Sequence, residues 1–274
     1  MATPHARKTK EVMQFETLDL ERSGAVARVT LDRPDAANAL NGQMMSDLLD
    51  VSIALDEDPT VRAVVLTGRG PMFCAGGDLA EFSRAGDTLP ALLKKLTTIF
   101  HGAVARFARM DAPLITAING TAAGAGFSLA VAGEYAMAAE SARFTMAYTN
   151  AGLTPDGSST FFISRLAGLR RAQELMITNR LLSAREAVDW CLVNEVVPDD
   201  RLQDEAMALA ERLASGPTRA FGSVKRLLLQ SAGDALESQM EAEARAIADA
   251  ARSADGREGI AAFLAKRKPS FTGN

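Results

Sequence analysis

The sequence predicts an α/β fold, and three observations support this prediction. Two apolar or β-branched runs, residues 61–67 and 113–118, each lead through a glycine-rich turn into a helix. A long amphipathic helix is predicted between them, over residues 89–110. From residue 200 onward almost only helical periodicity remains. Repeated strand, turn and helix units are typical of layered α/β domains.

The N-terminal part is predicted to begin with a loose leader and a hairpin. Residues 1–13 are basic, but no apolar core segment follows them, so a secretory signal is not expected. Two strands are predicted at residues 15–20 and 25–31, joined at residues 21–24. Apolar side chains then recur at helical spacing over residues 44–55, which predicts the first helix.

The second glycine turn lies in an uncharged stretch, residues 113–133. This stretch is long enough to span a membrane. However, small residues dominate it and Asn119-Gly120 would break a helix near its start, so we expect it to be buried inside the protein. No membrane partner is predicted.

The C-terminal half is predicted to be mostly helical. A short strand pair is expected at residues 135–139 and 143–147. Further helices are predicted at residues 159–166, 169–178 and 184–190, the last after a capping-box pattern at Ser183. The predicted division is a core at residues 14–199 and a helical region at residues 200–274, which packs on the core or on a partner subunit.

Composition excludes several classes of function. The net charge of -4 gives no general attraction to nucleic acid. Only Cys74 and Cys191 are present, which excludes a disulfide framework and favours a reducing, cytoplasmic location. These cysteines and the two histidines, His5 and His101, are too scattered to form a metal-ligand cluster, so no metal is predicted.

Two common glycine motifs also fail in the second turn. The pattern from Gly124 lacks the third glycine of a dinucleotide-binding loop. Ser128 lacks the final glycine of a nucleophile elbow, and both histidines precede it, which excludes a serine triad in the order that fold requires. Electrostatic catalysis by backbone N–H groups remains, because first-turn amides have no partner within their helix. Two such turns can place their N–H groups around one thioester oxygen. The alternative is that the glycines of both turns only allow close packing of the backbone.

Three segments resemble the enoyl-CoA hydratase/isomerase (crotonase) family. They are residues 73–79 (FCAGGDL), 117–126 (AINGTAAGAG) and 258–267 (EGIAAFLAKR). The resemblance covers the chain from about residue 15 and implies a crotonase-type spiral of ββα turns with a C-terminal helical region. It also implies a homotrimer or a dimer of trimers. By position, the oxyanion donors are the N–H groups of Gly77 and Ala125.

The resemblance implies an acyl-CoA thioester substrate, with coenzyme A as part of the substrate and no separate cofactor. The residues implied along coenzyme A are Ala37, Ala39, Leu40, Ala75, Gly76, Asp78 and Leu79. In the family, a phenylalanine and a lysine of the C-terminal tail lie over the coenzyme A of a neighbouring subunit. Here they are Phe263 and Lys266. The alternative is that this basic tail only solvates a helix.

Two departures from the family pattern disfavour simple hydration. Hydratases of the family carry glutamates at the positions of Ser128 and Tyr148. Adding water across a double bond needs a base and an acid, and neither hydroxyl replaces a carboxylate easily.

Asp156 is the remaining carboxylate near the implied site. An aspartate before glycine in a turn also caps helices without any further function. However, family members that isomerise 1,2-epoxyphenylacetyl-CoA or shift enoyl-CoA double bonds place a lone aspartate here. Residues 169–180 resemble the 4-chlorobenzoyl-CoA dehalogenases, whose catalytic histidine would fall near Ala105, so a role for His101 stays open.

We therefore predict an acyl-CoA isomerase. The thioester enolate would be held by the amides of Gly77 and Ala125, and Asp156 would move the proton. Tyr148 would orient Asp156 or line the acyl pocket. The alternatives are an enoyl-CoA hydratase, an enzyme resembling the 4-chlorobenzoyl-CoA dehalogenases, and a non-catalytic acyl-CoA-binding subunit. The sequence does not identify the acyl group.

Overall fold

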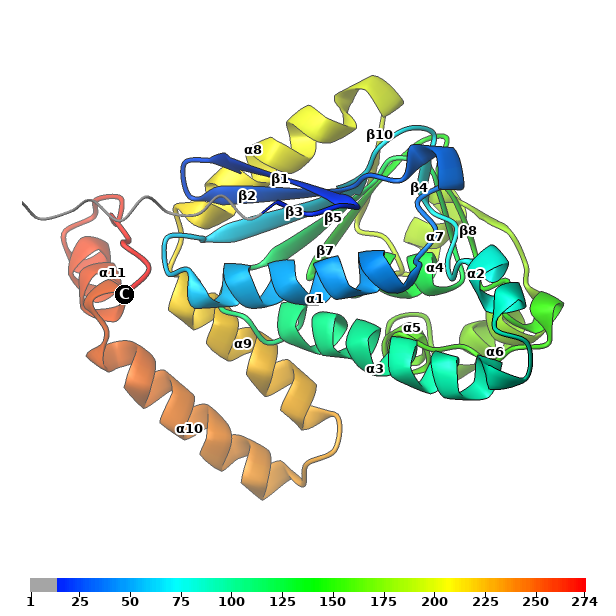
Figure 1. Ribbon diagram of the computed structural model, residues 1–274. Helices are drawn as coiled ribbons and strands as arrows, with labels where there is room; N and C mark the ends of the chain where they lie inside the picture. Colours follow the sequence, from blue (N-terminus) through cyan, green and yellow to red (C-terminus); the bar gives the residue numbers. More distant parts are fainter. Residues whose placement is uncertain (1–13) are drawn as a thin grey trace, which may run out of the picture.

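The structure is a computed structural model that describes residues 14–274, and it contains two β-sheets flanked by helices (Figure 1). The leader predicted at residues 1–13 lies outside the described residues. A six-stranded sheet has the order β1-β2-β3-β5-β7-β10, and a four-stranded sheet has the order β4-β6-β8-β9. The predicted α/β class is confirmed.

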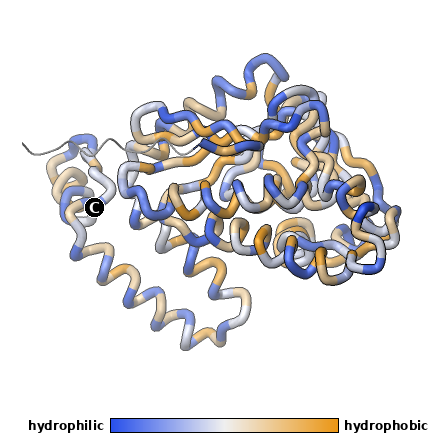
Figure 2. The backbone as a smooth tube through the Cα atoms, viewed as in Figure 1, coloured by the Kyte–Doolittle hydropathy of each residue, from blue (hydrophilic) through white to orange (hydrophobic). Residues whose placement is uncertain are grey.

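The larger sheet is parallel except at one edge. Its strands are β1 (Leu18–Ser23), β2 (Val26–Leu31), β3 (Ala63–Gly68), β5 (Leu114–Ile118), β7 (Tyr135–Ala139) and β10 (Glu195–Val197). Only β1 and β2 pair antiparallel. Every residue of β3 and β5 is buried, as expected for central strands covered on both faces. Figure 2 shows hydrophobic segments along these strands, between the flanking helices.

The smaller sheet is built from short strands that follow the larger one. They are β4 (Met72–Cys74), β6 (Thr121–Ala123), β8 (Arg143–Thr145) and β9 (Leu182–Ser183). Each of two successive units therefore places one strand in each sheet and then a helix, as β3-β4-α2 and β5-β6-α4. These are repeated ββα turns, and β4 and β6 lie parallel next to each other.

Seven helices precede the C-terminal region in the described chain. They are α1 (Gly42–Glu57), α2 (Leu79–Arg84), α3 (Leu89–Phe107), α4 (Ala125–Ala130), α5 (Ser159–Leu166), α6 (Leu169–Thr178) and α7 (Ala184–Asp189). In Figure 1, α1 and α3 lie side by side on one face of the larger sheet, where they pack against each other. All residues of α4 are buried, which agrees with the predicted buried helix.

Contact between the two glycine turns fixes their relative position. A Cβ added at Gly126 would lie 2.2 Å from the carbonyl oxygen of Cys74. Glycine is therefore required at residue 126, because a side chain there would separate the first turn of α4 from the end of β4.

The C-terminal helices are α8 (Leu202–Ala214), α9 (Thr218–Ser231), α10 (Leu236–Arg252) and α11 (Ala254–Leu264). The first of them, α8, packs against β2, β3, β5 and β7 and covers the face of the sheet opposite α1 (Figure 1). The next helix, α9, packs against the end of α3, where Lys225 Nζ donates to the carbonyl oxygens of Phe107 and Ala112. α10 and α11 lie farther from the sheet, and α11 lies at the opposite end of the molecule from α2 and α4 (Figure 1). Within residues 14–274, no helix has both the length and the hydropathy needed to cross a bilayer.

Two of the strand predictions are wrong in detail. β1 continues to Ser23 rather than ending at residue 20, because an edge strand pairs its backbone with β2 while its polar side chains face water. The strands predicted as a pair at residues 135–139 and 143–147 do not pair. β7 lies between β5 and β10, whereas β8 lies in the other sheet between β6 and β9.

Candidate active site

Two backbone amides without a partner border one cavity. This first cavity, of about 280 Å³, is lined by residues that include Gly77 and Ala125. In the described range of the chain, neither of their N–H groups donates a hydrogen bond. Ala125 is the first residue of α4, where no intrahelical acceptor exists. Leu40 bonds the Gly76 carbonyl and the Asp78 amide, so the N–H group between them stays free.

Glycine at residues 76 and 77 keeps the space in front of these amides open. Gly76 has a φ of +94°, and a Cβ there would lie 3.3 Å from the nitrogen of Ala125 and 2.8 Å from the carbonyl oxygen of Ala123. A Cβ at Gly77 would lie 2.8 Å from the ring of Phe82. The bare backbone therefore lets a ligand oxygen reach both donors.

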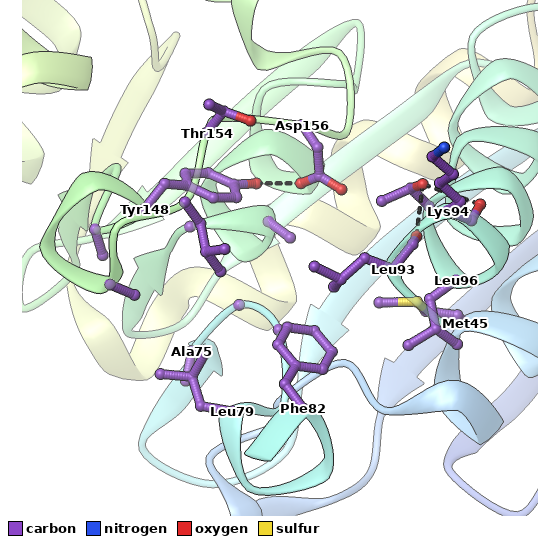
Figure 3. Close-up of a pocket in the computed structure, with 18 residues that line it drawn as sticks. Met45, Ala75, Leu79, Phe82, Leu93, Lys94, Leu96, Tyr148, Thr154 and Asp156 are labelled. Carbon is purple, nitrogen blue, oxygen red and sulfur yellow. Dashed lines mark hydrogen bonds between the residues drawn. The ribbon is translucent and has the colours of Figure 1, made fainter. Parts of the chain in front are cut away.

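The rest of the first cavity is mainly apolar and comes from the helices around it. Met45, Phe82, Leu93 and Leu96 extend from α1, α2 and α3, with Ala75 and Leu79 near the first turn (Figure 3). Among the described residues that line it, Asp156 is the only carboxylate and Lys94 the only cation. None of Phe82, Lys94 and Thr97 was predicted individually as a lining residue, because helical periodicity does not show which side chains border a cavity.

Asp156 is held by three hydroxyl groups, one of which is Ser159 Oγ, which donates to the Asp156 carbonyl oxygen at 2.9 Å. The Tyr148 hydroxyl donates to its Oδ1 at 2.5 Å, and the two side chains point toward each other in Figure 3. Ser128 Oγ donates to the carbonyl oxygen of Asp156 at 2.8 Å and lies 3.2 Å from the Tyr148 hydroxyl. Burial, and after it the charge of Asp156, raises the pKa of Tyr148 well above its ordinary value. Tyr148 is therefore a hydrogen-bond donor and not a base.

His101 also reaches this carboxylate, from α3. Its Nε2 accepts a hydrogen bond from the Gly157 N–H at 3.1 Å and lies 3.6 Å from Asp156 Oδ2. The Asp156 side chain is 22% exposed and borders the cavity. Since Tyr148 donates to Oδ1, Oδ2 is the carboxylate oxygen that accepts no hydrogen bond from the described residues.

Cys74 supports the first turn and is not a nucleophile. Its thiol is fully buried, and burial raises its pKa to about 12, so the thiolate is not available at neutral pH. Its Sγ accepts a hydrogen bond from the Gly76 N–H at 3.4 Å, which helps to fix this glycine. In the part of the chain that the structure describes, no group of three or more histidine, cysteine or acidic side chains is placed to hold a metal ion.

The residues predicted along coenzyme A lie together around the first turn. Ala75, Gly76 and Leu79 line the first cavity. Their neighbours belong to the segment from Ala37 to Leu40: the Ala37 carbonyl accepts from the Ala75 N–H at 3.0 Å, and the Ala39 carbonyl accepts from Arg33.

Asp78 has a structural task in this region. It caps α2 through the Glu81 N–H at 3.1 Å and pairs with Arg33 at 3.1 Å. Burial alone would raise its pKa, but these two partners lower the pKa of Asp78 below its ordinary value. Its carboxylate is therefore charged and already paired.

Phe263 and Lys266 are not near the first cavity of the same chain. Phe263 lies on α11 and is 83% exposed, and Lys266 follows that helix and is also exposed. Since α11 lies at the far end of the molecule (Figure 1), these residues do not cover the cavity of their own chain.

Tyr148→Phe is expected to lower kcat about tenfold, because Asp156 loses the hydrogen bond that orients it. Tyr135→Phe is the matched control. It removes the only other tyrosine hydroxyl, which bonds Glu195 at the surface at 3.1 Å. Steady-state kinetics with an acyl-CoA substrate checks this prediction, and equal kcat values for the two variants would contradict it.

Comparisons with known proteins place the chain among acyl-CoA enzymes. A family model described as enoyl-CoA hydratase/isomerase matches residues 21–274. A protein named 1,2-epoxyphenylacetyl-CoA isomerase from Escherichia coli is 39% identical over 96% of this chain and 100% of its own length. A probable enoyl-CoA hydratase from Rhodobacter capsulatus is 38% identical over 95% of this chain and 100% of its own length. The crystal structure of an enoyl-CoA hydratase from Polaromonas superposes with a TM-score of 0.89 at 32% identity, covering 93% of this chain and 99% of that one.

Proposed function

The chain belongs to the enoyl-CoA hydratase/isomerase (crotonase) family, and on this basis we propose that it is an acyl-CoA isomerase with Asp156 as its proton shuttle. The observation that carries the proposal is the placement of Asp156. It is the only carboxylate among the described residues lining the first cavity, which Gly77 and Ala125 also border. The positions where hydratases of the family carry glutamates hold Ser128 and Tyr148, which instead bond to Asp156.

In the proposed reaction, the thioester carbonyl oxygen accepts hydrogen bonds from the N–H groups of Gly77 and Ala125. Asp156 Oδ2 removes a proton from a saturated carbon of the acyl chain, either α to the thioester carbonyl or γ to it across a double bond. The electrons of the broken C–H bond form a new C=C bond, and the oxygen takes the negative charge that the two amides stabilise. Asp156 then returns the proton to another carbon, which shifts the double bond. No atom is gained or lost, and no cofactor is required.

Coenzyme A is proposed to lie beside the first turn, along the segments 37–40 and 75–79. We also propose that residues 200–274 assemble the protein into a homotrimer or a dimer of trimers. Several large hydrophobic side chains of this region are more than half exposed, namely Val224, Leu228, Leu236, Met240, Ile247, Ile260, Phe263 and Leu264. Phe263 and Lys266 of one subunit would then cover the coenzyme A of another. Sedimentation analysis of the full chain tests the assembly.

Hydration is the second candidate, because a relative of nearly equal identity carries a hydratase name. Mass spectrometry of the products distinguishes the two reactions. Incubation with an enoyl-CoA in deuterated water is expected to give an isomer that has gained no water. It contains deuterium to the extent that the proton held by Asp156 exchanges with solvent before it is returned. A product heavier by one water would support hydration and contradict the isomerase.

The same assay covers the remaining candidates. Halide release from 4-chlorobenzoyl-CoA would identify a dehalogenase. Tight binding of acyl-CoA thioesters without deuterium uptake, water addition or halide release across a panel of acyl groups would identify a binding subunit. The panel should contain both aliphatic and aromatic acyl groups. The first cavity is lined mainly by apolar side chains, and such a lining can accept either class.

A further inference from the structure

We propose that His101 is a positioning residue for Asp156, which leaves the carboxylate free to react only while the imidazole is neutral. This inference rests on the proposed isomerase function. It concerns one nitrogen atom, Nε2, which lies between a hydrogen-bond donor, the Gly157 N–H, and a hydrogen-bond acceptor, Asp156 Oδ2.

Nε2 is close enough to both groups to interact with either of them. Nε2 lies 3.1 Å from the N–H nitrogen of Gly157 and 3.6 Å from Oδ2 of Asp156. An imidazole nitrogen carries either a lone pair or a proton. With a lone pair it accepts from Gly157, and the neutral ring then carries its proton on Nδ1. With a proton it donates to Oδ2, and the Gly157 N–H loses its acceptor.

Packing leaves Gly157 little freedom to adapt. Its φ is +61°, and a Cβ there would lie 2.5 Å from the ring of Phe100 and 2.9 Å from Cβ of Ser128. Its backbone is therefore held close against α3 and α4, with the N–H directed at His101. In the described structure this is the hydrogen bond that the amide makes. Neutral His101 thus fixes the residue that follows Asp156.

The other contacts of Asp156 leave Oδ2 as its reactive oxygen. Tyr148 donates to Oδ1, and Ser128 and Ser159 both donate to the main-chain carbonyl. Neutral His101 adds no proton donor to Oδ2, so this oxygen can accept a proton from the acyl chain. Protonated His101 pairs with Oδ2 and competes with that step. The only change is a proton from water on Nε2, so no further reactant is required.

Few other charges face this ring. On α3 itself, Lys94 borders the first cavity. In the turn after α3, Arg109 borders a second cavity of about 420 Å³ that His101 also lines. From α5, Phe161 and Phe162 face the second cavity, and the Arg165 guanidinium lies over the Phe161 ring. From α9, Leu229 faces it, while Arg226 is paired with Asp111. Among these charged groups, Asp156 is the one that contacts the His101 side chain directly.

Water can reach the imidazole, since the His101 side chain is 49% exposed.

Nitrogen NMR tests the resting state without any activity assay. The chain has two histidines, so His5→Gln leaves a single labelled imidazole in the full-length protein. Above neutral pH, the nitrogen chemical shifts are expected to show the Nδ1–H tautomer, because the hydrogen bond at Nε2 selects it. An Nε2–H tautomer would overturn the proposal, whatever reaction the protein catalyses.

Kinetics test the consequence. Neither glutamine nor leucine ionises, but only glutamine has an oxygen that can accept the hydrogen bond from the Gly157 N–H. We expect kcat of His101→Leu to fall roughly tenfold with little change in KM, and His101→Gln to restore much of this loss. The fall in kcat/KM at acidic pH should be weaker in His101→Gln than in the parent protein. Identical pH profiles for the parent and His101→Gln would overturn the proposal.

The two tests separate this proposal from the proposed function. Absence of isomerase turnover in the parent protein would refute the function, and the tautomer would still decide whether Nε2 accepts from Gly157. Isomerase turnover with an Nε2–H tautomer would support the function and refute the role of His101.

Discussion

Asp156→Asn is expected to lower kcat by about 10² to 10⁴, the usual contribution of a positioned acid–base group. The amide keeps an oxygen for the Tyr148 hydroxyl, so the loop should retain its shape while Oδ2 loses its basicity. Binding of a non-reactive acyl-CoA, measured by calorimetry, should change little. Steady-state kinetics with the substrate found in the acyl-CoA panel gives the effect on kcat.

Asp199→Asn is the control for this substitution. Asp199 accepts a hydrogen bond from the Ser141 N–H at 3.0 Å at the surface, so the change again removes a charge and keeps an acceptor oxygen. It should leave kcat unaltered. Full turnover in Asp156→Asn would refute the proposed isomerase mechanism, because no other described residue lining the first cavity is a carboxylate.

Ala125→Pro is expected to lower kcat/KM by about 10² to 10³, which corresponds to about 2.7–4 kcal/mol for the loss of one oxyanion donor. Proline has no N–H group, and its ring would occupy the space where the thioester oxygen approaches. The first position of a helix tolerates proline well, because its N–H has no intrahelical partner there. Ala125 is the first residue of α4, so the fold should survive the change.

Leu169→Pro provides a matched control on α6. Leu169 is also the first residue of its helix, it also follows a glycine, and it is 65% exposed. Both variants should melt cooperatively near the temperature of the parent protein in circular dichroism. Activity should fall only in Ala125→Pro. If kcat/KM stayed within a few-fold of the parent value, the free amide of Ala125 would not be the oxyanion donor.

The strength of the local signals explains how much of the fold was predictable. The bounds of α5 and α6 agree with the prediction, because Gly168 separates two apolar periodic segments without ambiguity. β8 and β9 were harder, because strands of two or three residues are too short to show a period. Their sheet partners are set by tertiary packing, so adjacent strands in the sequence, β7 and β8, lie in different sheets.

The site shows the same limit. The turns at Gly77 and Ala125 were predictable, since glycine-rich turns after strands carry a strong local signal. The contact between His101 and Gly157 joins residues 56 positions apart and depends on how α3 lies beside the loop before α5. A single histidine on an amphipathic helix gives no signal of that contact. The same holds for Phe82, whose ring covers Gly77.

The close packing around Ser128 limits how this site can change its chemistry during evolution. Ser128 is fully buried, and its Oγ lies 2.8 Å from the Asp156 carbonyl oxygen. A Cβ added at Gly157 would lie only 2.9 Å from the Cβ of Ser128. A glutamate at residue 128 would need the volume that Asp156 and the Tyr148 hydroxyl now fill. The lone aspartate and the pair of glutamates are thus competing solutions for one space. Under the proposed function, a change from one set of side chains to the other would therefore require several neighbouring residues to be replaced together.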